Sequence, residues 1–251
     1  MISYVIFQDW QECLQKNLFG LFLLRSHGAY FFIASFLNIL SENKGDKFML
    51  GVYNYTVVLT YIGMLFSFVG ITFVWNGDVK SALACLMISG LCDMFDGKIA
   101  STKKRTVQEK RFGIQIDSLS DLICFGVFPA IIIYGVSEKD WITIPVCAFY
   151  VLCALIRLAY FNVDEEERQN CTEGGRTVYL GLPVTTAALV IPAVIYIADY
   201  GKLSGNIMNS IVLAVIGIGF ITPFQIKKPG ITGKFLLMMA GIVEFLVVIV
   251  R

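Results

Sequence analysis

Long apolar stretches recur along the chain after residue 50, and they limit its possible folds more than any other feature. A helix needs about 17–25 mostly apolar residues to cross the hydrocarbon core of a bilayer. Hydrophobic residues make up 57% of the chain and charged residues 16%, against about 45–50% and about 25% in soluble domains. We therefore predict an all-α polytopic membrane protein, a bundle of about six to eight transmembrane helices. The stretches lie at about 55–76, 80–101, 112–136, 141–162, 182–199, 206–225 and 234–250.

Basic residues gather in every second connection between these stretches. Cytoplasmic loops carry an excess of lysine and arginine, so these connections are expected to share the cytoplasmic side of the cell membrane. Trp75 and Trp141 then fall at the outer interface, where tryptophan is common. The basic connections contain Lys103, Lys104, Arg105, Lys110 and Arg111, then Arg168 and Arg176, then Lys227, Lys228 and Lys234. The opposite connections contain Lys80, Lys139 and Lys202.

The first 48 residues differ from the rest of the chain. Their segment 17–40 is apolar, but Arg25 and His27 interrupt it. No basic segment followed by a small-residue cleavage site is present, so we expect no signal peptide. The segment could be an eighth span, or an extension before a second start methionine, but we favour an interfacial or peripheral segment. We accordingly divide the chain into an apolar or amphipathic extension, 1–48, and a transmembrane domain, 49–251.

The cysteines and the single histidine do not indicate a metal or redox site of their own. The seven cysteines include no C-x-x-C pair, and most lie within apolar stretches, so we interpret them as reduced, small apolar residues. His27 has no partner histidine, so histidine-based zinc or haem chemistry is not expected. The net charge of +1 gives no indication of a nucleic-acid partner, and we expect none.

Four aspartates stand close together in this otherwise apolar sequence. Asp93 and Asp96 are three residues apart, and Asp117 and Asp121 are four apart, so each pair shares one face of its helix. The two helices are consecutive and are expected to run antiparallel. Counted outward from the centre of the basic connection, Asp96 and Asp117 are about equally distant, and so are Asp93 and Asp121. We predict two levels of facing carboxylates, about one to three helical turns from the cytoplasmic side.

Such a group of carboxylates in a membrane requires a compensating cation. One charged side chain near the bilayer centre costs about 2.5–3.5 kcal/mol on insertion scales. Sites made only of oxygen ligands suit Mg²⁺ or Mn²⁺, and two such ions about 3.5–4 Å apart can clamp a diphosphate. Gly97, Ala100 and Gly113 share the same helix faces and leave room for a ligand near the backbone. The alternative, helix caps or solvated loop charges, fits one aspartate better than four on two matched faces.

The chain reads DMFDGKIAS and then, after a short spacer, GIQIDSLSD. This pair of motifs resembles the signature of the CDP-alcohol phosphatidyltransferase family, D-x-x-D-G-x-x-A-R followed by G-x-x-x-D-x-x-x-D. Seven of the eight fixed positions agree. Ser101 stands where the family has arginine, and this departure bears on the affinity for the nucleotide. The role of that arginine is either vacant in this protein or taken by a neighbouring basic residue. The candidates are Lys98, Lys103 and Lys104.

Neighbouring stretches resemble the membrane-integral phosphatidylserine synthases of that family. They are RFGIQIDSLSDLICFGVFPA (111–130), RLAYFNV (157–163) and GLPVTTAA (181–188). The resemblance covers about residues 49–250. It implies that the substrates are CDP-diacylglycerol and L-serine, that the products are phosphatidylserine and CMP, and that Mg²⁺ or Mn²⁺ is required, with two ions expected. It also implies a homodimer in the lipid bilayer with a cytoplasm-facing active site.

The resemblance further implies roles for individual residues. Asp121 is expected to be the general base that takes the proton from the serine hydroxyl. The expected metal ligands are Asp93, Asp96, Asp117 and Asp121, and the residues expected to border the nucleotide are Gly97, Ala100 and Gly113.

Other polar residues have less specific interpretations. Arg157 could bind the phosphate or the serine carboxylate as a fork-shaped donor, or it could extend to the membrane interface. Asn162 and Thr185 are weaker candidates for the site. Glu244 could pair with a polar neighbour or mark a subunit contact. The acidic run 164–167 is interpreted as a solvated loop.

Two other classes of protein compete with an enzyme. A cation transporter or channel could use the aspartates as an ion path, but transport sites tend to lie at broken helices near the midplane of repeated halves. Here no repeat is visible and the helices are expected to be continuous. A structural scaffold with a degenerate site is the other class. Within the family, the alternative is a different acceptor alcohol, glycerol 3-phosphate or inositol.

Overall fold

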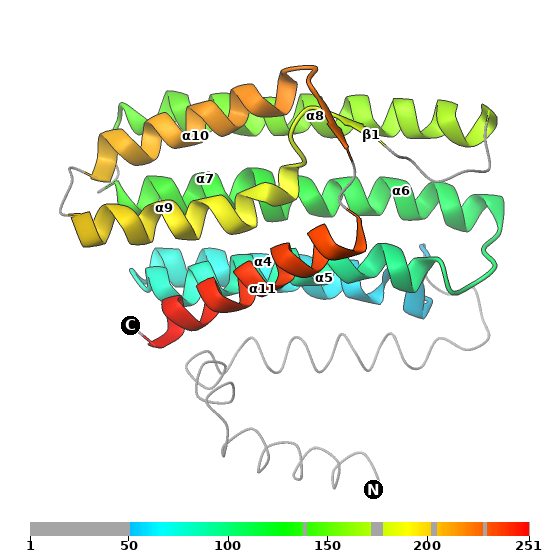
Figure 1. Ribbon diagram of the computed structural model, residues 1–251, viewed down its shortest axis with the longest axis horizontal. Helices are drawn as coiled ribbons and strands as arrows, with labels where there is room; N and C mark the ends of the chain where they lie inside the picture. The colour runs from blue at the N-terminus through cyan, green and yellow to red at the C-terminus, as the bar shows by residue number, and fades with distance from the viewer. Residues whose placement is uncertain (1–50, 138–139, 172–177, 202–204, 228–229, 251) are drawn as a thin grey trace, which may run out of the picture. The chain divides into compact units, whose positions relative to one another are not determined.

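The computed structural model describes residues 51–137, 140–171, 178–201, 205–227 and 230–250. The predicted extension 1–48 lies outside this part of the chain. From Asn54 onward the chain forms one compact unit, in which long helices lie side by side with their axes roughly parallel (Figure 1). The helices are α4 (Tyr55–Trp75), α5 (Val79–Ala100), α6 (Val107–Asp121), η1 (Leu122–Val127), α7 (Phe128–Val136), α8 (Thr143–Cys171), η2 (Val184–Thr186), α9 (Ala187–Gly201), α10 (Gly205–Ile221) and α11 (Ile231–Val250).

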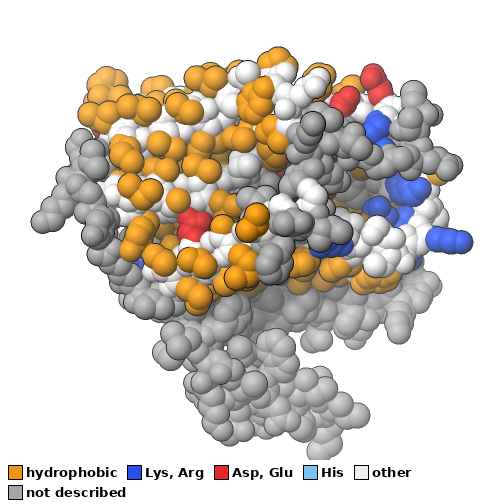
Figure 2. All heavy atoms as spheres, in the orientation of Figure 1, with side chains coloured by type: hydrophobic (Ala, Val, Ile, Leu, Met, Phe, Trp, Pro, Cys, Tyr) orange, Lys and Arg blue, Asp and Glu red, His pale blue; other side chains and the backbone are white. Residues whose placement is uncertain are grey.

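The helices have the apolar surface of a membrane protein. Among the described residues, three helices are long and apolar enough to cross a membrane: Tyr55–Trp75, Val107–Val136 and Thr143–Arg168. Shorter apolar helices are Val184–Ala198, Ile207–Ile221 and Met238–Val248. Hydrophobic side chains are spread over the described part of the face shown in Figure 2, and basic side chains gather at one end of it. The prediction of an all-α membrane protein is confirmed. Helix α5 is less apolar than α4 because its second half carries Asp93 and Asp96.

Two short strands join loops that are distant in the sequence. β1 (Val178–Leu180) pairs with β2 (Gln225–Lys227) in antiparallel orientation. The residue after β1, Gly181, has a φ angle of +74° and donates its backbone N–H to the carbonyl oxygen of Phe224 over 2.8 Å. The pairing therefore fastens the segment that enters α9 to the end of α10.

Small and hydroxyl residues allow α4, α5 and α7 to pack closely. Ser67 and Ser89 share a hydrogen bond of 2.8 Å, and the hydroxyl of Ser89 also donates to the carbonyl oxygen of Gly63 over 2.8 Å. A Cβ added to Gly70 would lie 2.1 Å from Cζ of Phe128 in α7. Small residues and interhelical hydrogen bonds are typical of helix packing in membranes. This packing fixes the position of α5, which carries two of the four aspartates.

The chain stays helical from Val107 to Val136, but the helix is not uniform. Its residues Leu122–Val127 form a π-helix that follows Asp121 directly. The buried Tyr150 of α8 donates its hydroxyl to the carbonyl oxygen of Phe125 over 2.6 Å, and so supplies a partner to the backbone of this segment. Short π-helical segments occur often at functional sites. The predicted continuous helix is therefore present, with a local change of winding next to the carboxylates.

The prediction of a solvated loop at 164–167 is wrong. These residues belong to α8, which continues to Cys171. Glutamate and arginine are good helix formers, and Arg168 pairs with Glu165 one turn earlier. The apolar stretch shows only where α8 would cross the hydrocarbon of a membrane. The helix itself continues beyond that stretch into the acidic residues.

Candidate active site

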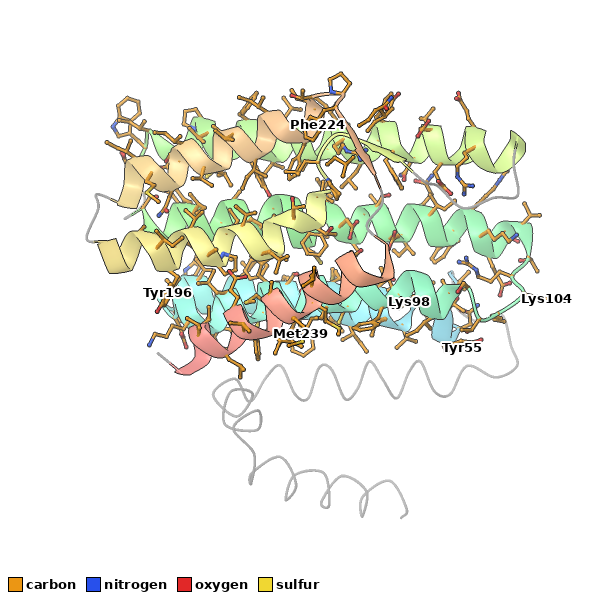
Figure 3. All side chains as sticks on the ribbon, viewed as in Figure 1. Tyr55, Lys98, Lys104, Tyr196, Phe224 and Met239 are labelled. Carbon is orange, nitrogen blue, oxygen red and sulfur yellow. The ribbon has the colours of Figure 1, made fainter. Side chains whose placement is uncertain are left out.

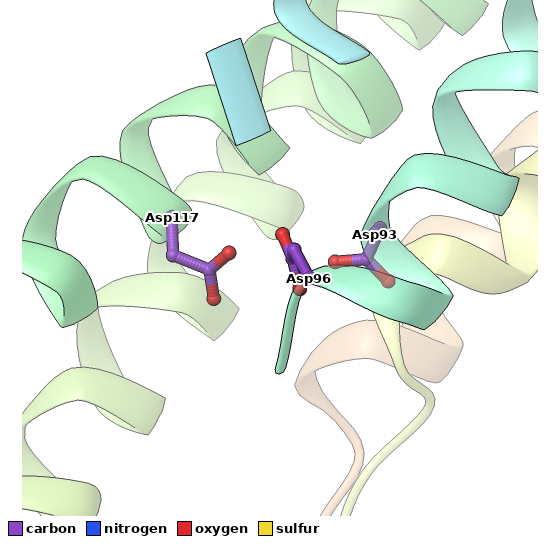
Figure 4. A group of neighbouring side chains, drawn as sticks. All are labelled: Asp93, Asp96 and Asp117. Carbon is purple, nitrogen blue, oxygen red and sulfur yellow. The ribbon is translucent and has the colours of Figure 1, made fainter. Parts of the chain in front are cut away.

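Three carboxylates from two helices meet between α5 and α6. Asp93 and Asp96 project from α5 and Asp117 from α6, and one oxygen of each lies within 4.8 Å of the other two (Figure 4). Asp96 is buried, and the other two are half-buried. Among the described residues, no lysine or arginine forms an ion pair with them. Carboxylates so close together without a basic partner form an oxygen-only donor set, which suits a hard divalent cation.

Asp121, the last residue of α6, lies at a second level of the same site. Its carboxyl group is within hydrogen-bonding reach of that of Asp93, and the carboxyl group of Asp96 is within reach of that of Asp117. These are the two facing pairs that the spacing predicts. Asp121 is not among the three residues whose oxygens converge, so it lies at the edge of the candidate metal centre.

Hydroxyl groups connect the aspartate-bearing helices to their neighbours. Thr60 of α4 donates to Oδ2 of Asp96 over 3.0 Å, and Ser120 of α6 donates to the carbonyl oxygen of Thr60 over 3.3 Å. Ser118 donates to Oδ1 of Asn162 in α8 over 2.5 Å. Hydrogen bonds of this kind orient the ligands of a metal site. Sequence reasoning identified Asn162 but not the three hydroxyl residues, whose only signal is a polar group within an apolar helix.

The small residues of the signature leave different amounts of space. A Cβ added to Gly97 would meet no described atom within 4 Å, and this residue is exposed. A Cβ added to Gly113 would meet one described atom, Nη1 of Arg105, at 3.1 Å. Ala100, at the end of α5, is half-buried. The surface beside Gly97 is therefore open, whereas a guanidinium group lies over Gly113.

Glu109 organises the connection between α5 and α6. Its backbone N–H donates to Oγ1 of Thr106 over 3.1 Å, and its Oε2 accepts from the backbone N–H of Thr106 over 2.8 Å, which forms a capping box. Its Oε1 accepts from Nδ2 of Asn54 over 3.0 Å and from Nζ of Lys103 over 3.4 Å. The cap explains why α6 begins at residue 107, five residues before the apolar stretch.

Arg157 is buried at the junction of α8 with the loop before η2. Its Nε donates to the carbonyl oxygen of Leu182 over 3.3 Å, and its guanidinium carbon lies 5.6 Å from the centre of the Phe161 ring. A Cβ added to Gly181 would lie 3.5 Å from the same Nε. The interpretation that this arginine extends to the membrane interface is therefore wrong, because the side chain is enclosed by the protein.

Two further candidates lie outside the carboxylate cluster. Thr185 is half-buried in η2. Glu244 of α11 is half-buried, and its Oε1 is buried without a hydrogen-bond partner among the described residues. Both interpretations of Glu244, a polar neighbour and a subunit contact, therefore stay predictions.

A hollow of about 450 Å³ lies between α6 and α8. Across it, Arg111 and Glu166 form an exposed ion pair of 3.7 Å, a type of contact that contributes little to stability. None of the four aspartates lines this hollow, so it is separate from the carboxylate site. Its lining residues are Val107, Lys110, Arg111, Ile114, Gln115, Asn162 and Glu166.

Comparison with known proteins identifies relatives that share this region. The chain is 32% identical over 123 residues to CDP-diacylglycerol–serine O-phosphatidyltransferase of Saccharomyces cerevisiae, covering 48% of this chain and 44% of that protein. It is 32% identical over 159 residues to archaetidylserine synthase of Methanothermobacter thermautotrophicus, covering 63% and 62%. It is 28% identical over 180 residues to CDP-diacylglycerol–serine O-phosphatidyltransferase of Helicobacter pylori, covering 70% of each.

The match thus spans less than two thirds of the first two relatives. The profile of the family described as CDP-alcohol phosphatidyltransferase matches residues 53–222, which include both aspartate-bearing helices, Arg157 of α8 and the loop before η2. That is more than half of the chain. The protein belongs to the CDP-alcohol phosphatidyltransferase family.

Proposed function

We propose that this protein transfers the phosphatidyl group of CDP-diacylglycerol to the hydroxyl of L-serine, giving phosphatidylserine and CMP. The observation that carries the proposal is the convergence of the signature carboxylates from α5 and α6 within 4.8 Å. The names of the three relatives all include the word serine, which supports serine as the acceptor. The lipid group in these names differs, because one relative is named archaetidylserine synthase.

The carboxylates fit a divalent cation. Asp93, Asp96 and Asp117 would hold it, with Asp121 facing the same site, and the donor set of oxygens alone suits Mg²⁺ or Mn²⁺. We propose two ions, which would neutralise charge on the diphosphate and on the departing phosphate. Thr60 would keep one oxygen of Asp96 oriented through its hydrogen bond of 3.0 Å.

Asp121 is proposed as the general base. It would accept the proton of the serine hydroxyl as that oxygen forms a bond to the phosphorus that carries diacylglycerol. The bond from this phosphorus to the bridging oxygen breaks, and CMP leaves with the bonding electrons. Asp121 lies at the edge of the cluster, about one helical turn after Asp117. This position is consistent with a base that faces the acceptor.

The remaining residues are proposed to bind the substrates. Gly97, Ala100 and Gly113 would border the nucleotide, and the open surface beside Gly97 supports this role. Arg157 is proposed to bind the phosphate or the serine carboxylate. The hydrogen bond from its Nε to Leu182 would hold the guanidinium in one orientation.

We also propose the membrane setting of the enzyme. The basic α5–α6 connection adjoins the aspartates, which supports a site on the cytoplasmic side of the cell membrane. We propose that 49–251 is the catalytic transmembrane domain, that 1–48 is an extension outside it, and that the enzyme is a homodimer.

One assay tests the proposed function. Purified full-length protein in detergent receives CDP-diacylglycerol and Mn²⁺, with L-serine, glycerol 3-phosphate or inositol offered in turn, and CMP release is measured. We expect release with serine only, its loss on chelation with EDTA, and its return with Mn²⁺ or Mg²⁺. CDP-archaeol as a second donor tests the lipid.

Other results would redirect the assignment. Release with another alcohol and none with serine would refute the acceptor. No release with any alcohol, together with divalent-cation flux across proteoliposomes, would favour the transporter.

A further inference from the structure

The family signature places an arginine at position 101, and the serine found there does not replace it. Ser101 is exposed at the end of α5, where its hydroxyl donates to the carbonyl oxygen of Lys98 over 2.6 Å. The side chain therefore binds its own helix end and adds no positive charge to the site. A cation at this end of the carboxylate cluster would bind a phosphate group through strong charge-assisted hydrogen bonds.

The three lysines suggested by the sequence are poorly placed to supply that charge. Lys103 is held by Glu109 at 3.4 Å. Nζ of Lys98 lies 5.5 Å from the centre of the exposed Phe95 ring. Lys104 is exposed at the outer end of the α5–α6 connection (Figure 3). One of these lysines is paired and another lies over an aromatic ring, and the third is turned to the outside.

Arg105 is placed differently. Its Nη1 lies 3.1 Å from the position that a Cβ of Gly113 would occupy, so the guanidinium lies directly on the helix surface that the signature glycine leaves free. Gly113 is one helical turn before the metal-ligand candidate Asp117 and on the same face. Arg105 is half-buried, and no carboxylate among the described residues forms an ion pair with it.

The backbone around Arg105 is held in place from both sides. Before it, Lys103 binds Glu109, and the hydroxyl of Thr102 shares a hydrogen bond of 3.1 Å with that of Tyr55. After it, Thr106 forms the capping box of α6. A guanidinium presented from such a fixed position loses little conformational entropy when it binds an anion.

We propose that Arg105 binds the phosphate groups of the CDP moiety over Gly113 and so replaces the arginine that the family has at position 101. This inference rests on the proposed function for the choice of CDP-diacylglycerol as ligand. The planar guanidinium can donate two parallel hydrogen bonds to phosphate oxygens. In this arrangement Gly113 leaves room both for the nucleotide and for the guanidinium of Arg105, which a side chain at position 113 would displace.

The test uses the purified full-length protein and four variants. They are Arg105→Ala, Arg105→Lys, the double variant Arg105→Ala with Ser101→Arg, and Arg111→Ala as a control for loss of an exposed arginine near the start of α6. Two quantities are measured for each: the KM values for CDP-diacylglycerol and serine, and the Kd of CDP in the presence of Mn²⁺ by calorimetry. Thermal unfolding of each variant checks that it is folded.

We expect Arg105→Ala to raise the KM for CDP-diacylglycerol and the Kd of CDP by roughly tenfold or more, as for loss of a charged hydrogen bond. The KM for serine should stay within about twofold, since Arg105 is proposed to contact only the CDP moiety. Arg105→Lys should be intermediate because lysine keeps the charge without the fork. Restoring arginine at 101 should recover much of the loss, and Arg111→Ala should match the unmodified protein.

The inference and the proposed function fail separately. If folded Arg105→Ala binds CDP within about twofold of the unmodified protein, Arg105 has no such role. If serine-dependent turnover is absent but CDP binding depends on Arg105, the acceptor is wrong and the inference stands. If the unmodified protein releases CMP with serine but does not bind CDP with Mn²⁺, the inference is refuted and the proposed function stands.

Discussion

The glycines of this bundle serve opposite purposes in two regions. Where α4 packs on α7, a Cβ on Gly70 would lie 2.1 Å from Phe128, and one on Gly135 would lie 2.6 Å from Val74. Near the α5–α6 connection, a Cβ on Gly97 would meet no described atom within 4 Å. The first region, the packed region around Gly70 and Gly135, uses glycine to bring helices together. The second, the open region around the four aspartates, uses it to leave space for a ligand.

The polar groups of the packed region are paired with each other, whereas those of the open region are left available for a ligand. In the packed region the hydroxyls of Ser67 and Ser89 satisfy each other. In the open region Asp93, Asp96 and Asp117 face one another without a basic partner among the described residues. Unpaired carboxylates destabilise a membrane helix, so their presence supports the proposed cation-dependent function better than a contribution to folding.

The largest effect is expected from Asp121→Asn in the open region. The change removes the proposed base and keeps the side-chain volume, so kcat should fall by about 10²–10⁴-fold. The midpoint of thermal unfolding should change little, because no packing is lost. Steady-state CMP release and a thermal scan of the same sample measure both quantities. Near-normal turnover would refute the role of Asp121 as base.

A matched pair of glycine variants tests the comparison itself. Gly70→Ala should cost about 1–3 kcal/mol of stability through overpacking against Phe128. Its KM for CDP-diacylglycerol should remain unchanged. Gly97→Ala should leave the stability unchanged and raise that KM by about tenfold, as for loss of one close contact. Equal stability of the two variants in a chemical-denaturation or thermal scan would contradict the distinction between packed and open regions.

A smaller effect is expected from Thr60→Val. This variant keeps the shape of the side chain and removes the hydrogen bond to Asp96. Loss of an outer-shell hydrogen bond typically lowers metal affinity by about 10–100-fold, and the lower end is expected because Asp96 itself remains. Ser67→Ala is the control, since it removes a hydroxyl from the packed region. If both variants bind Mn²⁺ equally well in a titration, Thr60 does not support the metal site.

The sequence predicts the helices and the pairing of the carboxylates well, for a physical reason. Apolar stretches of bilayer length determine where α4 and α5 begin and end to within a residue or two. Two consecutive helices joined by a short connection have a single antiparallel register. Counting from the connection is therefore enough to pair Asp96 with Asp117 and Asp93 with Asp121.

Features that depend on contacts between non-consecutive helices could not be predicted. The bonds from Thr60 to Asp96 and from Ser118 to Asn162 cross the bundle, and the sequence does not indicate which hydroxyl faces which helix. The polar end of α8 resembles a loop in the sequence, because an apolar stretch shows where a helix crosses the membrane and not where the helix ends. The location of Arg105 over Gly113 depends on the capped turn.

Binding of Mn²⁺ to the aspartates of α5 and α6 would establish the proposed divalent-metal centre. The full-length protein is titrated with Mn²⁺ in the presence of CDP, and free Mn²⁺ is followed by electron paramagnetic resonance. We expect saturable binding of two ions per chain, as in other two-metal sites. We also expect a loss of affinity of at least about tenfold in Asp117→Asn. Equal stoichiometry and affinity in the folded variant would contradict the proposed metal centre.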